Sequence, residues 1–140
     1  MHSYLEQAKQ TLKENELTCA IVGADTLYTS TQRGIAPLLE CYHESKVPQH
    51  CSGADKVVGR AAAFMYVLLG VDSLYAEVIS RPAYKVLVEA GISVEYGTMV
   101  DAIINRTGTG FCPMETAVLH INDPHEALTA VERTLERLRN

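Results

Sequence analysis

The stretch SGADKVVGRAAAFMYVLLG, residues Ser52–Gly70, contains the longest apolar run of the chain. From Ala61 onward it consists almost entirely of core-forming residues, and we interpret Gly53–Leu69 as one central, buried helix. Its first turns carry Lys56 and Arg60, four residues apart, so a helix would place two positive charges on the same face. Such a like-charge pair at the start of a buried helix indicates a partner, either acidic residues elsewhere in the chain or an anionic ligand.

The composition fits one domain over residues 1–140. The chain is 47% hydrophobic, which is enough for a sizeable core. Its net charge of −5 argues against binding to a nucleic-acid polymer or a membrane surface. No apolar run is long enough to span a membrane, and the polar, helix-forming N-terminus is not a signal peptide. Four cysteines without a CxxC pair favour a reduced, cytoplasmic protein: Cys19, Cys41, Cys51 and Cys112.

Outside the central stretch, helical and strand patterns alternate. Periodicity and turn residues predict further helices at Ser3–Glu16, Gly34–His43, Pro82–Ala90, Pro113–His120 and Pro124–Arg139. Strands are predicted at Leu17–Val22, Thr26–Ser30, Ser73–Ile79, Ile92–Tyr96 and Asp101–Asn105, the first two forming a hairpin. This order predicts an α/β fold, a three-layer α-β-α sandwich with one mixed sheet and helices on both of its faces.

Three predicted helix starts have the chemistry of an anion site. A helix N-terminus exposes unpaired amide groups and carries partial positive charge, so it attracts anions. The three starts are Gly53–Lys56, Ser80–Lys85 and Asn105–Thr116. The third is glycine-rich but lacks the GK[ST] ending of a phosphate-binding P-loop. A connection leading into an ordinary capped helix remains its equal alternative.

The charges of the first helix start allow three interpretations. Lys56 and Arg60 lie at the solvated end of a partly exposed helix, pair with acidic side chains, or hold a ligand anion between them. Gly59, inside the predicted helix, leaves room for close packing or for a ligand, of which close packing is the more frequent cause. The candidate acidic partners are Glu95, Asp101 and Glu115.

The order of elements resembles the cytidine-deaminase-like fold, and SRPAYKVLVEAGISVEY (Ser80–Tyr96) resembles a deaminase helix running into its strand. Deaminases take zinc ligands from His-x-Glu or Cys-x-Glu at the second core helix and from Pro-Cys-x-x-Cys at the next. The resemblance implies that Gly53 stands in place of the His or Cys ligand and Asp55 in place of the catalytic Glu. Ala83 and Val86 would replace the two cysteines, and Pro82 is the one motif residue retained.

A family of deaminase-fold proteins of unknown function is a closer resemblance. It rests on the GADKVVGRAAA helix, on Arg33–Leu39 after the hairpin and on Cys112–Glu115, and it spans nearly the whole chain. It implies the fold rather than a function. Because the zinc ligands are absent, we expect no metal, no other cofactor and no zinc-dependent deamination.

The resemblance implies that the first two helix starts meet at one pocket, closed by the last loop. We predict that this pocket binds an anionic small molecule, nucleotide-like or phosphate-bearing, through Lys56, Arg60 and the helix dipoles. The predicted ligand-binding residues are Gly53, Asp55, Lys56, Gly59, Arg60, Arg81, Pro82, Tyr84, Arg106, Gly108, Gly110, Cys112 and Glu115.

Two other functions remain open. The chain could be a structural or oligomeric interaction protein with a vestigial pocket, and analogy with the fold makes a homodimer possible. It could also be an enzyme, with Cys112 as a nucleophile at a helix start or Lys56 as a base or Schiff-base amine. The candidate catalytic residues are Asp55, Lys56, Cys112 and Glu115.

Overall fold

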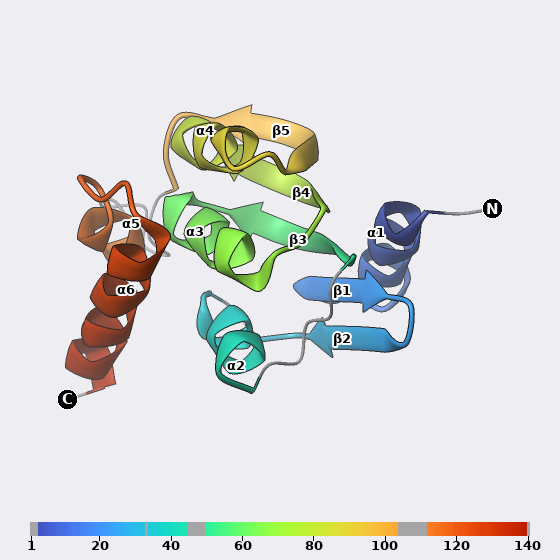
Figure 1. Ribbon diagram of the computed structural model, residues 1–140, viewed down its shortest axis with the longest axis horizontal. Coiled ribbons are helices and arrows are strands. Elements are labelled where there is room, and N and C mark those ends of the chain that lie inside the picture. The colour runs from blue at the N-terminus through green and yellow to red at the C-terminus, as the bar shows by residue number, and fades with distance from the viewer. Residues whose placement is uncertain (1–2, 33, 45–49, 104–111, 140) are drawn as a thin grey trace.

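The computed structural model describes residues 3–32, 34–44, 50–103 and 112–139 (Figure 1). The helices are α1 (Tyr4–Glu14), α2 (Ala36–Glu44), α3 (Arg60–Leu69), α4 (Arg81–Glu89), α5 (Pro113–Ala117) and α6 (Pro124–Arg139). The strands are β1 (Cys19–Gly23), β2 (Thr26–Ser30), β3 (Ser52–Val58), β4 (Ser73–Ser80) and β5 (Ser93–Val100).

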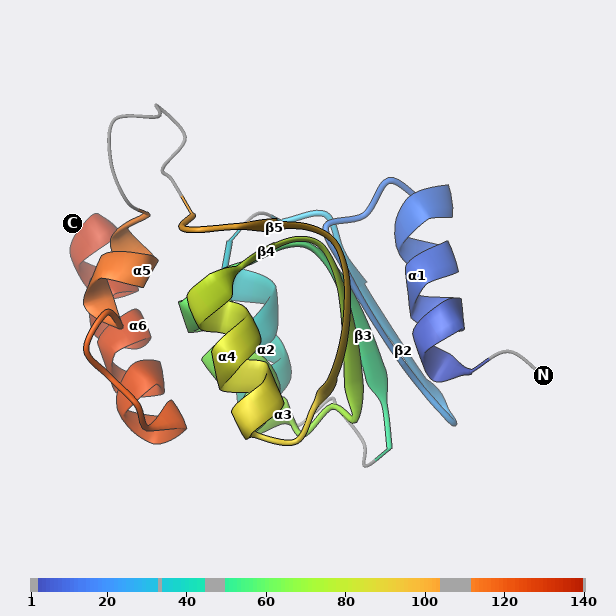
Figure 2. The ribbon, with the colours of Figure 1, turned by 90° about the horizontal axis from the view of Figure 1, so that it is seen from above.

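The five strands form one mixed sheet in the order β2-β1-β3-β4-β5. β1 is antiparallel to both of its neighbours, β2 and β3, whereas β3, β4 and β5 are parallel to one another. α1 covers one face of the sheet, and α2, α3 and α4 cover the other (Figure 2). The prediction of an α/β fold with a mixed sheet and helices on both faces is therefore confirmed; α5 and α6 add an outer layer, in which α6 packs on α3.

The main correction concerns the stretch Ser52–Gly70. The prediction of one helix over Gly53–Leu69 is wrong in its first part, because Ser52–Val58 is the central strand β3. Ser52, Gly53 and Ala54 are buried between β1 and β4, where small residues fit between two helix-covered faces. The like-charge pair therefore does not exist as predicted, since Lys56 lies on a strand and Arg60 begins the helix.

The same correction also changes which residues correspond to the zinc ligand and the catalytic Glu of deaminases. Gly53 and Asp55 were placed at a helix start, and both lie inside β3 instead. The helix start is Gly59, whose backbone is extended (φ −95°, ψ −177°), followed by Arg60. α3 ends at Gly70, whose left-handed conformation (φ 75°) lets its N–H donate to the carbonyls of Tyr66 and Val67.

Most other boundaries agree with the sequence patterns. The hairpin β1–β2, helix α1 and helix α6 form where they were predicted, and Ser80 caps α4 by accepting from the N–H of Ala83 at 3.2 Å. The predicted strand Asp101–Asn105 is wrong for Asp101–Ile103, because β5 runs on from the predicted Tyr96 to Val100 and ends there. α5 ends at Ala117 rather than at His120.

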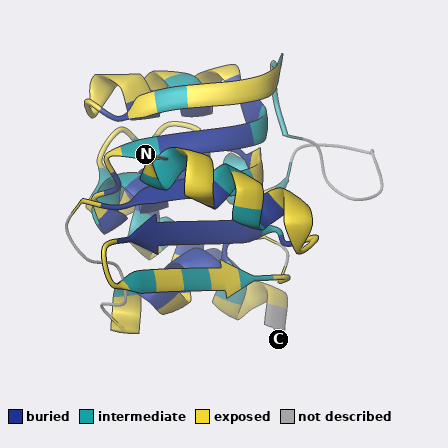
Figure 3. Ribbon diagram, turned by 90° about the vertical axis from the view of Figure 1, so that its right-hand side faces the viewer, coloured by how far each residue is buried: buried dark blue, intermediate teal, exposed yellow. Residues whose placement is uncertain are grey.

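Burial follows the position of each strand in the sheet. β1 is buried throughout, and β3 and β4 are largely buried, whereas the two edge strands β2 and β5 are more exposed (Figure 3). No helix among the described residues has both the length and the apolar character needed to cross a membrane. The three buried strands β1, β3 and β4 form the interior of the protein, and the pockets described below lie at the ends of these strands.

The pairing of β5 with β4 depends on a missing side chain at Gly97. A Cβ at this position would lie 2.9 Å from the backbone carbonyl oxygen of Glu77, which cannot move without disturbing the sheet. We expect Gly97→Ala to lower the free energy of unfolding by about 1–3 kcal/mol, as overpacking does. The matched control Thr98→Val, at an exposed neighbour, should change it by less than about 0.5 kcal/mol. Urea denaturation measures both, and equal effects would contradict the prediction.

Candidate functional site

The carboxyl ends of the parallel strands β3, β4 and β5 meet at one edge of the sheet, where α3 and α4 begin. Open α/β sheets bind their ligands at this edge. Two pockets lie here. One is formed by the residues that follow β4 and β5, and the other by the end of β3 and the start of β1.

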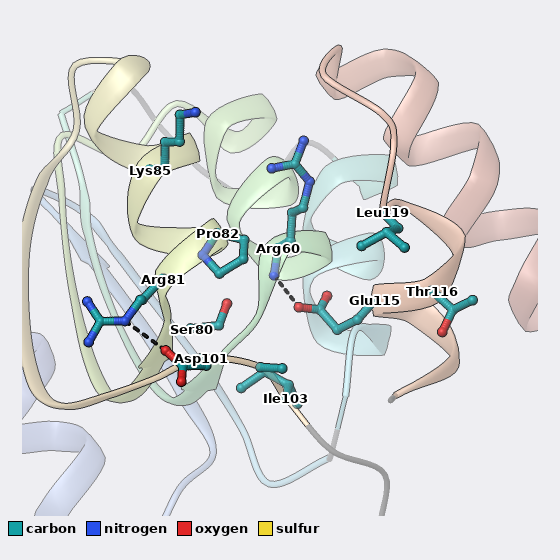
Figure 4. A pocket seen from close by; sticks show the side chains of 11 residues that line it. Arg60, Ser80, Arg81, Pro82, Lys85, Asp101, Ile103, Glu115, Thr116 and Leu119 are labelled. Atoms are coloured by element: carbon teal, nitrogen blue, oxygen red, sulfur yellow. Dashed lines mark hydrogen bonds and ion pairs between the residues drawn. The ribbon is translucent and has the colours of Figure 1, made fainter. Parts of the chain in front are cut away.

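The first, which we call the α3–α4 pocket, has a volume of about 520 Å³ (Figure 4). Its walls combine apolar side chains with three basic and two acidic residues. Its lining residues are Arg60, Ser80, Arg81, Pro82, Lys85, Asp101, Ala102, Ile103, Glu115, Thr116 and Leu119. The pocket thus brings together Arg60, Arg81, Pro82 and Glu115 from the predicted site.

The start of α3 is occupied by a carboxylate of the chain itself. Glu115, on α5, accepts from the N–H of Arg60 at 2.6 Å and from the N–H of Ala61 at 2.9 Å, as Figure 4 shows for Arg60. These are the first amides of the observed helix, seven residues after the predicted start at Gly53, and a carboxylate there is favoured by the helix dipole. Gly59 serves this contact, because a Cβ there would lie 2.6 Å from Cδ of Glu115.

The guanidinium of Arg60 is committed to the end of α5. Its Nε donates to the carbonyl of Val118 at 3.2 Å, and its Nη2 donates to the carbonyl of Ile121 and, at 3.0 Å, to Oδ1 of Asn122. It also lies 5.0 Å from the ring centroid of Phe64. Carbonyls at a helix C-terminus attract a cation, so the Arg60 charge stabilises the chain's own fold.

The other two basic residues of this pocket are more available. Nε of Arg81 lies 2.8 Å from Oδ1 of Asp101, but both side chains are largely exposed (67% and 91%), so this ion pair contributes little stability. Lys85 has no ion pair with any residue that the structure describes. Of the acidic partners considered for Lys56 and Arg60, none pairs with either side chain among the described residues: Asp101 pairs with Arg81, Glu95 pairs with Lys9, and Glu115 binds backbone amides.

The second pocket, which we call the Asp55 pocket, has a volume of about 510 Å³ and lies beside the start of α2. Its lining residues are Thr18, Cys19, Thr31, Gln32, Gly34, Pro37, Leu38, Asp55, Lys56 and Val57. It shares no lining residue with the α3–α4 pocket. The residues of the single predicted site therefore lie in two pockets, with Asp55 and Lys56 in one and Arg60 and Arg81 in the other.

Asp55 is held by a chain of hydrogen bonds. The Tyr66 hydroxyl donates to Oδ2 of Asp55 at 2.7 Å, and the N–H of Val57 donates to Oδ1 at 3.2 Å. Sγ of Cys19 lies 3.4 Å from the Tyr66 hydroxyl, which, as the donor to Asp55, can accept from the thiol. Burial raises the pKa of Asp55 to about 7, although bonds from Tyr66 and the amides of Val57 and Lys56 oppose the rise.

Gly53 leaves space for the Tyr66 ring beside these hydrogen bonds. A Cβ on Gly53 would lie 3.1 Å from Cε1 of Tyr66 and 3.1 Å from Cδ1 of Leu74, so glycine leaves room for the tyrosine ring. Burial also raises the pKa of the Tyr66 hydroxyl and of the Cys19 thiol, so both keep their protons at neutral pH. Gly53 is not among the lining residues of either pocket, and packing against Tyr66 accounts for a glycine at this position.

The site residues predicted from the sequence do not include Cys19 or Tyr66. One signal could have found Tyr66: a buried tyrosine hydroxyl in an apolar helix needs a hydrogen-bond partner. Reading Gly53 and Asp55 as alternate positions of one strand would have put the carboxyl on the face that meets this hydroxyl.

The remaining predicted residues have varied places. Tyr84 packs edge-on against Tyr96, with ring centroids 5.8 Å apart, and does not line the α3–α4 pocket. Cys112 is partly exposed before α5. Arg106, Gly108 and Gly110 lie outside the described residues. Within the described ranges no group of three or more His, Cys, Asp or Glu side chains could hold a metal ion.

Comparison with known proteins gives a family and a fold relative. A family model described as TM1506, domain of unknown function (DUF1893), matches residues 7–135. The chain is also similar to the crystal structure of a DUF1893 family protein (TM1506) from Thermotoga maritima, with 26% identity and a TM-score of 0.84. That similarity covers 98% of this chain and 92% of the other. A search of curated proteins found no match.

The contact between Gly59 and Glu115 can be tested by a double-mutant cycle. Glu115→Ala removes the carboxylate from two helix amides and should lower the free energy of unfolding by about 1–2 kcal/mol. Gly59→Ala should cost about as much, because the added Cβ displaces the same carboxylate. With Glu115 already removed, Gly59→Ala should cost less than it does in the parent protein, because no carboxylate is left for the added Cβ to displace. Fully additive costs in urea denaturation would contradict this coupling.

The raised pKa of Asp55 predicts how stability depends on pH. The folded-state value of about 7 lies above the value of about 3.9 of an unfolded chain, so folding takes up a proton between these pH values. The contribution of Asp55 to the free energy of unfolding should therefore fall as pH rises through this window, by up to about 1.4 kcal/mol per pH unit. The difference between the parent protein and Asp55→Asn, measured by urea denaturation across this range, isolates it. If the free energy of unfolding of the parent protein minus that of Asp55→Asn stays constant or increases with pH, the pKa of Asp55 is not raised in the folded protein.

Proposed function

The chain belongs to the TM1506 family, a domain of unknown function (DUF1893), and we propose that its α3–α4 pocket binds a small anionic molecule, nucleotide-like or phosphate-bearing. The observation that carries the proposal is a pocket with apolar walls and available basic side chains, Arg81 and Lys85, at the carboxyl edge of the sheet. Pockets of this kind, apolar with a few polar groups, are typical of small-molecule sites.

The dimensions and charges of the pocket support this class of ligand. Its volume of about 520 Å³ lies within the usual range for small-molecule sites. Pro82, Ile103 and Leu119 offer apolar surface for a ring. Lys85 can approach a phosphate as a point charge, and Arg81 can exchange its exposed bond with Asp101 for a stronger bond to a phosphate.

The anion contacts differ from those expected from sequence. The proposal assigns no ligand to the α3 amides, because Glu115 accepts from them. It also leaves the Arg60 guanidinium with the carbonyls after α5. We place the negative charge of the ligand near Lys85 and Arg81, at the start of α4. The N–H of Ala83 in this first turn already donates to the Ser80 hydroxyl, so the two basic side chains supply the contacts.

We propose in addition that the fold is of the cytidine-deaminase type, from the order of its helices and strands. Deaminases take their zinc ligands from the start of the second core helix and the start of the next helix, with one strand between them. In this chain these two helices are α2 and α3, with β3 between them. The residues there, Gly34–Leu38 and Gly59–Ala63, contain no His or Cys, so zinc does not fit.

The other functions considered stay predictions. The homodimer, the cytoplasmic location and the role of Cys112 as a nucleophile are each open to direct measurement. Lys56 lies on β3 and Arg60 begins α3, so Lys56 does not have Arg60 one helical turn away, the neighbour that was expected to make it a base. Size-exclusion chromatography with light scattering measures the oligomeric state.

The proposed function is tested by titrating AMP, ribose 5-phosphate and adenosine into the protein and recording amide chemical shifts. We expect the two phosphate-bearing probes to bind and adenosine to bind more weakly, with the shifts centred on Ser80–Lys85. Lys85→Gln should weaken AMP binding by roughly ten- to a hundredfold, the effect of one charged hydrogen bond.

Lys56→Gln is the matched control, since it removes the same charge from the other pocket. It should leave the affinity for AMP unchanged at constant ionic strength. Equal weakening by both substitutions would show a nonspecific charge effect and overturn the site, as would the absence of binding by either phosphate-bearing probe. Native mass spectrometry of freshly purified protein adds an independent search for a bound molecule.

A further inference from the structure

The Asp55 pocket contains a carboxyl group without a basic partner. Among the described residues no Lys, Arg or His side chain forms an ion pair with Asp55, although the group is half-buried beside β1 and α3. A charge removed from water is normally paired, and leaving it unpaired is costly. The fold therefore keeps a carboxyl in a cavity at a cost that a ligand could relieve.

The hydrogen bonds of Asp55 orient this carboxyl without filling its capacity. The Tyr66 hydroxyl donates to one oxygen, the N–H of Val57 donates to the other, and the N–H of Lys56 also interacts with the carboxyl, whereas a carboxylate has about four acceptor positions. The remaining positions can accept N–H donors from a molecule in the cavity, which Asp55 lines. Tyr66 is itself fixed by the space that Gly53 leaves, so the carboxyl is held in one orientation.

We propose that the Asp55 pocket is a second binding site, for a small molecule that presents a protonated amine or an amidinium group to the Asp55 carboxyl. A charged N–H donor paired with a carboxylate forms one of the stronger hydrogen bonds available in water. Lys56 lines the same pocket with an exposed side chain, so the rest of the ligand is uncharged or acidic. This site is independent of the α3–α4 pocket, and either proposal can fail without the other.

Binding at this site is coupled to a proton. The groups that act on Asp55 are Lys56 on its own strand, Cys19 on β1, Tyr66 on α3 and Glu77 on β4; α2 contributes Pro37 and Leu38, which do not titrate. Cys19 and Tyr66 keep their protons near neutral pH, and the negative charge of Glu77 slightly raises the pKa of Asp55. Because the cation binds the ionised carboxylate, its affinity increases about tenfold per pH unit below the pKa and becomes constant above it.

The experiment uses benzylamine as the probe, with benzyl alcohol and benzoate as controls of the same size. The ¹³C chemical shift of the Asp55 carboxyl is followed as each compound is added, at a series of pH values between about 5 and about 9. We expect benzylamine to bind, to lower the pKa of Asp55 and to shift the amides of Thr18, Cys19 and Lys56. Benzyl alcohol and benzoate should do neither.

Two variants separate this site from nonspecific charge attraction. Asp55→Asn keeps the shape of the side chain and an acceptor for Tyr66, and should abolish benzylamine binding. Asp25→Asn makes the same change at an exposed aspartate in the β1–β2 turn, outside both pockets, and should not affect it. Tyr66→Phe keeps the carboxyl but removes its donor, so benzylamine should still bind, with its pH dependence displaced to higher pH.

The proposal is overturned if benzylamine leaves the Asp55 carboxyl unshifted at every pH, if benzoate binds equally well, or if Asp55→Asn and Asp25→Asn have equal effects. Should Asp55→Asn fail to fold, the Tyr66→Phe variant and the carboxyl titration of the parent protein still decide the matter. In that case, affinity for benzylamine that does not change with pH contradicts the proposal. None of these outcomes depends on whether AMP binds elsewhere.

Discussion

The position of β3 in the middle of the sheet is the constraint on which the rest of the structure depends. β3 pairs antiparallel with β1 and parallel with β4, so it joins the N-terminal hairpin to the parallel part of the sheet. Small residues at its start, Ser52–Ala54, fit between covered faces, and Gly53 leaves the space that Tyr66 fills. The strand then delivers Asp55 to one pocket and, through Gly59, the start of α3 to the other.

The second determining interaction is the carboxylate of Glu115 on the first amides of α3. A helix start at the carboxyl edge of a sheet is normally open to an anionic ligand. Here α5 supplies the anion, and Arg60 returns a positive charge to the carbonyls at the other end of α5. The two contacts form a reciprocal arrangement, each charge lying at the helix end that its sign favours. They fasten α5 to α3, and α6 follows because it packs on both helices.

Where local signals are strong, the sequence predicted the structure well. Ser3 and Ser80 start helices as side-chain caps, Gly70 ends α3 in the left-handed conformation, and the hairpin β1–β2 forms where strand residues flank a turn. The strand β3 was not predicted, because Ser-Gly-Ala-Asp-Lys has weak strand propensity and is followed directly by a helical pattern. Its strand conformation comes from pairing with β1 and β4, which are distant in sequence. The contact of Glu115 with Gly59 is equally non-local, so composition and spacing suggested an acidic partner but not which atoms it would meet.

The separation of Lys56 from Arg60 also changes the chemistry that this edge of the sheet can perform. On one helix face the two cations would have formed a single anion site with Asp55 beside them. In the fold, Asp55 and Lys56 on β3 line a pocket beside α2, whereas the Arg60 side chain donates to the carbonyl of Val118 at the end of α5. The contact between Gly59 and Glu115 lies at this junction, which contributes residues to both pockets. One pocket then has available cations, and the other has a carboxyl that forms no ion pair with the described residues, so ligand groups of opposite charge suit the two pockets better than a single anion does.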